Sequence, residues 1–181
     1  MFRRIRPDGV RYVHSSPPSG TASCGPLEDD PVDAPLSDEL ILAVAGARRR
    51  ALRDADRQID TAHLLHSLLE SDPAVRAACG DDGHLARLLG YLVQRSIGYG
   101  LRWQGSVEDS GAVPVVRGVP GWSPVAAAAM CAGAERAAAR GGGPARGLDV
   151  LAALTDDPES RAVEVLGRAG IDVQDLRRRL N

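Results

Sequence analysis

An internal duplication is the feature that most limits how this chain folds. Landmarks of the first half recur in the second at an offset of 86 residues, or 85 for the last pair. The matched segments are Leu36-Ser37 with Trp122-Ser123, 63–69 with 149–155, and Asp72-Pro73 with Asp157-Pro158. Because a half of this size has a thin core, the two halves are expected to pack together as one domain.

Hydrophobic periodicity predicts four helices in each half. Ser37 is a candidate N-cap, and an apolar stripe of Leu40, Val44, Ala47 and Ala51 follows it at helical spacing. The other expected starts and ranges are Asp60 or Thr61 for the second helix, Pro73 for the third, 83–97 for the fourth, Ser123-Pro124 to Arg140 for the fifth, 147–155 for the sixth, Pro158 for the seventh and Asp172 for the eighth. Since aromatic residues make up only 3% of the chain, the core must be built from Leu, Val and Ala, which favours closely packed helices. The predicted fold class is all-α.

Composition divides the chain into four segments. Residues 1–35 are Arg-rich, then rich in Ser, Pro and Gly, then acidic, which predicts a flexible tail. Repeat one spans 36–97, a Gly-rich connector spans 98–121, and repeat two spans 122–181. The connector is expected to be extended, with a short strand-like piece at Val113-Pro114-Val115-Val116.

Several classes of chemistry are excluded or disfavoured by composition. All 22 Lys plus Arg residues are Arg, so a P-loop ending in G-K-[ST] and a catalytic lysine are both excluded. Three cysteines at wide spacing, Cys24, Cys79 and Cys131, form neither a disulfide framework nor a C-x-x-C pair, and we expect reduced thiols. No signal peptide or membrane span is recognisable, so the expected location is the cytoplasm.

The duplicated motifs resemble the Clp N-terminal (Clp repeat) domain of the ClpA/ClpC-type AAA+ unfoldases. The family pattern is a Phe-Thr-type helix start, an Ile-x-Thr-x-His-Leu-Leu run and an Ala-x-x-Val-Leu-x-x-x-Gly-Ile-Asp run. The residues that carry it are Leu36-Ser37 and 59–69 in repeat one, and Trp122-Ser123-Pro124 and 162–172, which include Gly170, in repeat two. The resemblance covers about residues 36–181 and implies an eight-helix, pseudo-twofold domain.

The resemblance implies a non-catalytic module that binds proteins or peptides. Its expected partners are Clp unfoldase or protease components, adaptors, client proteins or cyclic peptides, and it is expected to need no ATP, cofactor or metal. The chain ends at Asn181, directly after the second repeat, so we expect a free-standing domain that acts as an adaptor, modulator or decoy. The alternative is a regulatory binder of nucleic acid or another anionic surface through the Arg-rich arm at 1–14.

Departures from the family pattern bear on the expected site. ClpC-like members carry a Glu before the motif His in each repeat, which holds the guanidinium of phosphoarginine. Ala62 and Leu148 stand at these positions, so phosphoarginine recognition by that route is not expected. The motif Thr61 and His63 of repeat one are replaced by Gly147 and Asp149 in repeat two. We expect four positions to contact partners: Leu36 and Trp122 at the helix starts, and Ala62 and Leu148 at the places of the family glutamates. For Trp122 a place in the core is an equal alternative.

Two further groups of residues could carry chemistry, but their sequence context disfavours it. His63, His66, Cys79 and His84 could offer zinc ligands, but their spacing matches no known motif. A thiol nucleophile, Cys79 with His63 or His84, lacks an orienting third residue. The runs Arg48–Arg50 and Arg177–Arg179 are expected to be solvated helix faces, with docking of an acidic partner as the alternative.

Overall fold

The computed structural model describes residues 34–96, 108 and 121–181. Nearly all of the expected tail, including the Arg-rich arm, lies outside the described residues, as do most of the connector and its strand-like Val113–Val116 piece. Within the described part of the chain, no helix is both long and apolar enough to cross a membrane.

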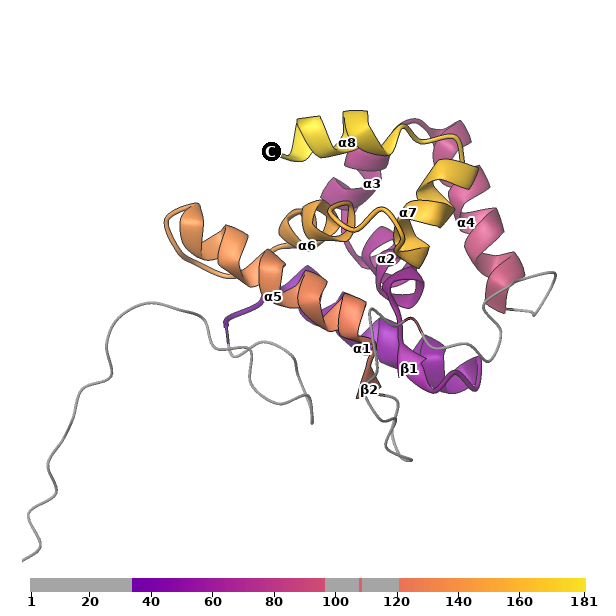
Figure 1. Cartoon of the computed structure of the whole chain (residues 1–181), viewed down its shortest axis with the longest axis horizontal. Helices are drawn as coiled ribbons and strands as arrows, with labels where there is room; N and C mark the ends of the chain where they lie inside the picture. Colours follow the sequence, from indigo (N-terminus) through magenta and orange to yellow (C-terminus); the bar gives the residue numbers. More distant parts are fainter. Residues whose placement is uncertain (1–33, 97–107, 109–120) are drawn as a thin grey trace, which may run out of the picture.

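The described residues form eight α-helices and two very short strands (Figure 1). In chain order the elements are α1 (Asp38–Arg53), β1 (Gln58–Ile59), α2 (Thr61–Ser71), α3 (Pro73–Cys79), α4 (Asp82–Ser96), β2 (Gly121–Trp122), α5 (Pro124–Ala139), α6 (Gly147–Leu154), α7 (Arg161–Arg168) and α8 (Val173–Leu180). The prediction of an all-α fold with four helices in each repeat is confirmed. The duplication also holds in detail, because adding 86 to both ends of α1 gives both ends of α5.

Side-chain caps fix where most helices begin. Ser37 Oγ accepts from the Leu40 N–H (3.3 Å), and Ser123 Oγ accepts from the Ala126 N–H (3.1 Å) at the equivalent start of α5. These caps satisfy N–H groups that lack a partner in the first helical turn. One predicted start is wrong: Pro158 does not open α7, which begins at Arg161 because Ser160 Oγ accepts from the Val163 N–H (3.3 Å).

The two repeats are joined by parallel backbone pairing, which is not among the features predicted from the sequence. β1 pairs with β2 so that Ile59 lies beside Trp122, and an isolated parallel bridge joins Leu36 to Ala145. Adding 86 to Leu36 and to Ile59 gives Trp122 and Ala145, so the two pairings are equivalent. In each pairing, the residue before the first helix of one repeat pairs with the segment before the second helix of the other repeat. The pseudo-twofold relation is therefore visible in the backbone pairing.

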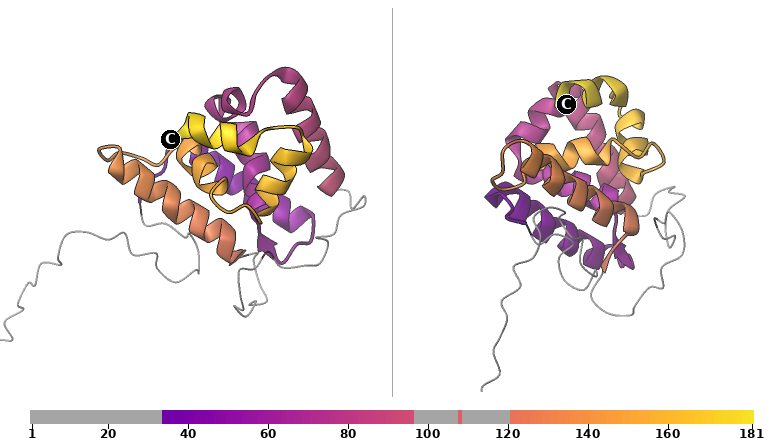
Figure 2. Two further views of the ribbon diagram at one scale, coloured as in Figure 1. Left: turned by 45° about the horizontal axis from the view of Figure 1, so that its top comes forward. Right: turned by 60° about the vertical axis from the view of Figure 1, so that its left-hand side comes forward.

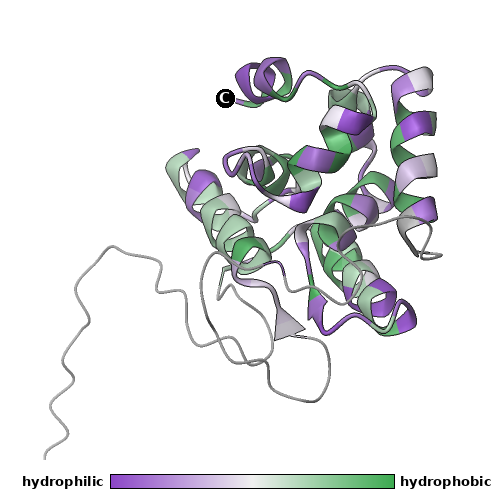
Figure 3. Cartoon of the chain, turned by 45° about the vertical axis from the view of Figure 1, so that its right-hand side comes forward, coloured by the Kyte–Doolittle hydropathy of each residue, from purple (hydrophilic) through white to green (hydrophobic). Residues whose placement is uncertain are grey.

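The core lies around α2 and α6, with the other helices packed outside them (Figures 1 and 2). Every residue of α2 from Thr61 to Leu69 is buried. The predicted stripe of α1, Leu40 to Ala51, is buried against α2, and α5 packs against α6 in the same way. Hydrophilic and hydrophobic residues alternate along the helices, as is typical of amphipathic helices (Figure 3). Among the described residues four large hydrophobic side chains remain exposed: Ile41, Leu42, Leu52 and Val93.

Candidate peptide-binding site at the junction of the repeats

A buried carboxylate lies where the two repeats meet. Glu108, whose side chain comes from the connector, is only 7% exposed. One of its oxygens accepts from the Thr61 N–H (2.8 Å) and from Ser123 Oγ (3.0 Å). The other oxygen accepts from Thr61 Oγ1 (2.5 Å) and from the Arg161 N–H (2.9 Å). Four donors from three elements thus hold one carboxylate.

The electrostatics of this site follow from the helices that build it. Thr61 and Arg161 are the first residues of α2 and α7, so their N–H groups point out of the positive ends of two helix dipoles. Ser123 is the N-cap of α5. Three helix starts converge on one anion, which is the arrangement that favours bound carboxylates and phosphates. Glu108 cannot be recognised from the sequence, because the connector has no periodicity that would mark a buried residue.

An apolar cavity of about 290 Å³ shares Thr61 with this site, because Thr61 both lines the cavity and donates to Glu108. Apolar side chains of α5 and α6 form most of its wall, and two aspartates that follow α6 also line it. The lining residues are Thr61, Pro124, Val125, Ala128, Ala129, Ala132, Ala153, Leu154, Asp156 and Asp157. Its composition, a few polar groups around an apolar wall, is typical of a site that takes a side chain of a partner. Asp156 is already paired with Arg136 (3.0 Å) and Arg177 (2.8 Å).

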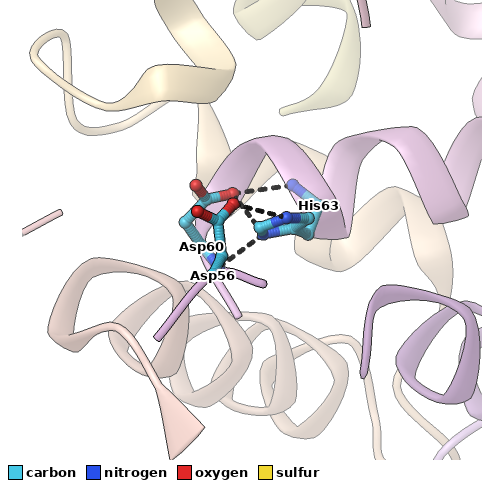
Figure 4. Close-up of side chains that lie close together, drawn as sticks. All are labelled: Asp56, Asp60 and His63. Carbon is cyan, nitrogen blue, oxygen red and sulfur yellow. Dashed lines mark hydrogen bonds and ion pairs between the residues drawn. The ribbon is translucent and has the colours of Figure 1, made fainter. Parts of the chain in front are cut away.

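His63 and two aspartates cluster at the start of α2 (Figure 4). The Asp60 N–H donates to His63 Nδ1 (3.2 Å), and the His63 N–H donates to Asp60 Oδ1 (2.8 Å), which is a reciprocal capping box. His63 Nε2 lies 3.1 Å from Asp56 Oδ2, and the other Asp60 oxygen forms a buried ion pair with Arg161. The geometry gives His63 and Asp60 a structural role: they start α2 and bind it to repeat two.

The same cluster is the candidate metal site of the described residues. Among the described residues, Asp56, Asp60 and His63 are the one group whose ligand atoms lie within 4.8 Å of one another. They do not fit the role well, because Asp60 is already engaged in the helix cap and in the pair with Arg161. The set considered from sequence, in which His66, Cys79 and His84 join His63, is not brought together as a ligand group within the described ranges.

In repeat two, Asp149 takes the position that His63 holds in repeat one. Asp149 Oδ2 accepts from the Arg146 N–H (2.8 Å), so the third residue of α6 also bonds back to its N-cap backbone, and Asp149 is further paired with Arg140. The replacement of His by Asp therefore keeps the capping interaction. Gly170, the last motif residue, has a φ of +86° just after α7, a conformation that glycine adopts without strain.

The four positions expected to contact partners are buried to different degrees. Ala62 is fully buried, Trp122 is 5% exposed, and Leu36 and Leu148 are partly buried against the core. The burial of Trp122 favours the core alternative. Ala62 and Leu148 lie in the first turns of α2 and α6. Neither side chain carries a carboxylate that could bind a guanidinium group, so these two positions do not form a phosphoarginine site of the ClpC type.

The two cysteines in the described segments differ in state. Cys79 is free and 1% exposed, and burial raises the pKa of its thiol to about 11. A thiol of this kind is a poor nucleophile at neutral pH. Cys131 is disulfide-bonded, so the prediction of reduced thiols is wrong for this residue.

Comparison with known proteins identifies the fold. No family model matches the sequence, and no curated protein matches it. Solved structures do match: the Hsp104 N-terminal domain from Candida albicans has a TM-score of 0.59 and 15% identity, covering 81% of this chain and 89% of that one. The N-terminal domain of the caseinolytic protease associated chaperone ClpD from Arabidopsis thaliana has a TM-score of 0.58 and 17% identity, covering 80% of this chain and 91% of that one. The chain has the Clp N-terminal domain fold, which confirms the fold expected from the duplicated motifs.

Proposed function

We propose that this protein is a non-catalytic module that binds protein segments for a cytoplasmic Clp-type unfoldase. The observation that carries the proposal is the cavity at the start of α5, next to Thr61 and at the junction of the repeats. It is apolar, is open to solvent and lies on a fold shared with the N-terminal domains of two chaperones. The partner is an unfoldase subunit, an adaptor or a client, and the module acts as an adaptor, modulator or decoy.

Three features support binding rather than catalysis. The buried Cys79 thiol has a raised pKa, which removes the nucleophile considered from sequence. His63 is held in a helix cap rather than beside a reacting group. The cavity itself is lined mainly by alanine and other apolar side chains, which suit recognition of a partner side chain by shape and burial.

Cross-linking in native lysate, followed by mass spectrometry, tests the proposal. Ala128 is exposed and lines the cavity, so Ala128→Tyr fills the cavity from its wall. Ala138 is exposed on the same helix and does not line the cavity, so Ala138→Tyr is the matched control. Wild type and Ala138→Tyr should both capture a Clp unfoldase subunit or its adaptor, and Ala128→Tyr should capture neither. Equal capture by all three proteins, or recovery of no Clp component by the wild type, would contradict the proposal.

A further inference from the structure

The Glu108 carboxylate occupies a site that is built like a receptor for an anion. Its four donors are two backbone N–H groups at helix starts and two hydroxyls, and they come from both repeats. None of these four hydrogen bonds comes from an arginine side chain, because helix starts and hydroxyls supply all four donors. Buried donors of this kind must be satisfied, and a carboxylate with two oxygens satisfies all four at once.

We propose that this site is a carboxylate receptor, filled in cis by Glu108, that also accepts in trans the carboxylate of an acidic segment of a partner protein. The inference deepens the proposed function and rests on it for the identity of the partner. Thr61 connects the receptor to the cavity, because it donates twice to Glu108 and also lines the cavity wall. Because Thr61 is common to both, the proposed partner segment places an apolar side chain in the cavity and a carboxylate at the receptor.

The Glu108 carboxylate competes with the carboxylate of a partner for the same donors and thereby lowers the affinity for the partner. A group tethered to its own site competes at an effective concentration in the millimolar range. An external ligand can bind only those molecules whose site Glu108 has left. Its apparent affinity is therefore lower than its intrinsic affinity, in proportion to the fraction of molecules with a vacant site. Removing the Glu108 carboxylate should raise the affinity for an acidic segment about tenfold or more.

A peptide copying the chain's own residues 105–111, Gly-Ser-Val-Glu-Asp-Ser-Gly, is the probe. Its affinity is measured by titration against the wild type, Glu108→Ala and Glu108→Gln, with the amide signals of Thr61 and Arg161 followed by NMR. The control peptide has Gln in place of the Glu that corresponds to Glu108. We expect the Glu peptide to bind Glu108→Ala at least about tenfold more tightly than it binds the wild type, and to shift both amide signals. The Gln peptide should do neither.

A paired substitution locates the binding. In the Glu108→Ala background, Ser123→Gly removes one donor of the receptor, whereas Ser37→Gly removes the equivalent N-cap of α1, where no contact with Glu108 occurs. Both changes cost only a few tenths of a kcal/mol as caps, since glycine is tolerated there. Peptide affinity should fall with Ser123→Gly and stay unchanged with Ser37→Gly.

Three results would overturn the proposal. The first is equal affinity of the peptide for wild type and Glu108→Ala, and the second is equal binding of the Glu and Gln peptides. The third is displacement of the peptide by inorganic phosphate or acetate at concentrations below that of the peptide, which would show a site for small anions only. If Glu108→Ala does not fold, Glu108→Gln takes its place in the titration. If neither variant folds, the wild type is titrated with millimolar peptide. Amide signals of Thr61 and Arg161 that do not shift in that titration would then refute the proposed receptor. None of these measurements involves an unfoldase, so they fail or succeed independently of the proposed function.

Discussion

Replacing Gly133 by alanine tests the close contact between α5 and α6, the two helices that form most of the cavity wall. A Cβ atom at Gly133 would lie 2.7 Å from Val150 Cγ2 and 3.2 Å from both the backbone N and the Cα of Val150. The methyl group of Val150 can rotate away, but its backbone belongs to α6 and moves only with that helix. Gly133→Ala therefore forces α5 and α6 apart.

Two opposing effects set the size of the change. Alanine is about 1 kcal/mol more favourable than glycine inside a helix. Overpacking of a closely packed interior costs about 1–3 kcal/mol, and contact with backbone atoms places this site toward the upper end of that range. The free energy of unfolding should therefore fall by about 1–2 kcal/mol in Gly133→Ala.

Gly90→Ala is the matched control, because Gly90 lies inside α4 with nothing within 4 Å of the added Cβ. It keeps the gain in helix propensity without the collision, so its free energy of unfolding should rise by up to about 1 kcal/mol. Urea denaturation followed by circular dichroism measures both variants, with the midpoint compared at an unchanged m-value. If Gly133→Ala is as stable as Gly90→Ala, the contact between α5 and α6 is not as close as the structure shows.

Two further perturbations test buried polar groups. Arg161→Met removes the guanidinium that is paired with the buried Asp60 carboxylate and should cost about 3–5 kcal/mol of stability. Arg168→Met breaks a more exposed pair, with Glu164, and should cost less than about 1 kcal/mol. Thermal or urea denaturation compares the two variants. His66 is buried, and its pKa is lowered to about 4. Burial is the main cause, and the positive charge of Arg50 adds to it. Between pH 6.5 and pH 4 the His66 side chain is protonated in the unfolded chain but stays neutral in the folded chain. The free energy of unfolding should therefore fall as the pH drops from about 6.5 to about 4, by an amount on the order of 3 kcal/mol. His66→Gln should lose less stability over that range in urea titrations, and an equal loss in both proteins would refute the assignment.

The sequence predicted the helices well where local signals were strong. Ser37, Asp60, Ser123 and Asp172 cap helices as expected, because a side-chain oxygen next to the first turn is a local interaction that sequence alone can reveal. Pro158 misled because proline is also common in turns, and the competing cap at Ser160 decided the start of α7.

Long-range polar contacts could not be foreseen in the same way. β1 and β2 are two residues each, too short to leave an alternating pattern. Glu108 lies 47 residues from Thr61 and 53 from Arg161, and its burial depends on three helix starts that meet only in the folded chain. The candidate site was therefore invisible from the sequence, although the Thr61 and Ser123 that build it were both named as motif residues.

The replacement of the motif Thr by Gly147 in repeat two now has a physical reason. A Cβ at Gly147 would collide with the Asp72 carboxylate and lie 2.9 Å from Val75 Cγ2. Asp72 is itself fixed at that place as the N-cap of α3, where it accepts from the Ala74 N–H (2.8 Å). At the start of α6 a carboxylate that is committed to a helix cap therefore fills the space, and no hydroxyl can stand there.

The two junctions of the pseudo-twofold domain thus differ in what they can bind. At the start of α2, Thr61 and Ser123 supply hydroxyls to a carboxylate that comes from the connector. At the start of α6, the carboxylate of Asp72 belongs to the fold, and its removal would uncap α3. A partner with an acidic segment should accordingly bind this protein with one-to-one stoichiometry despite the duplication. Two equal binding sites in a calorimetric titration would mean that the carboxylates of Glu108 and Asp72 are equally replaceable, which the cap at α3 argues against.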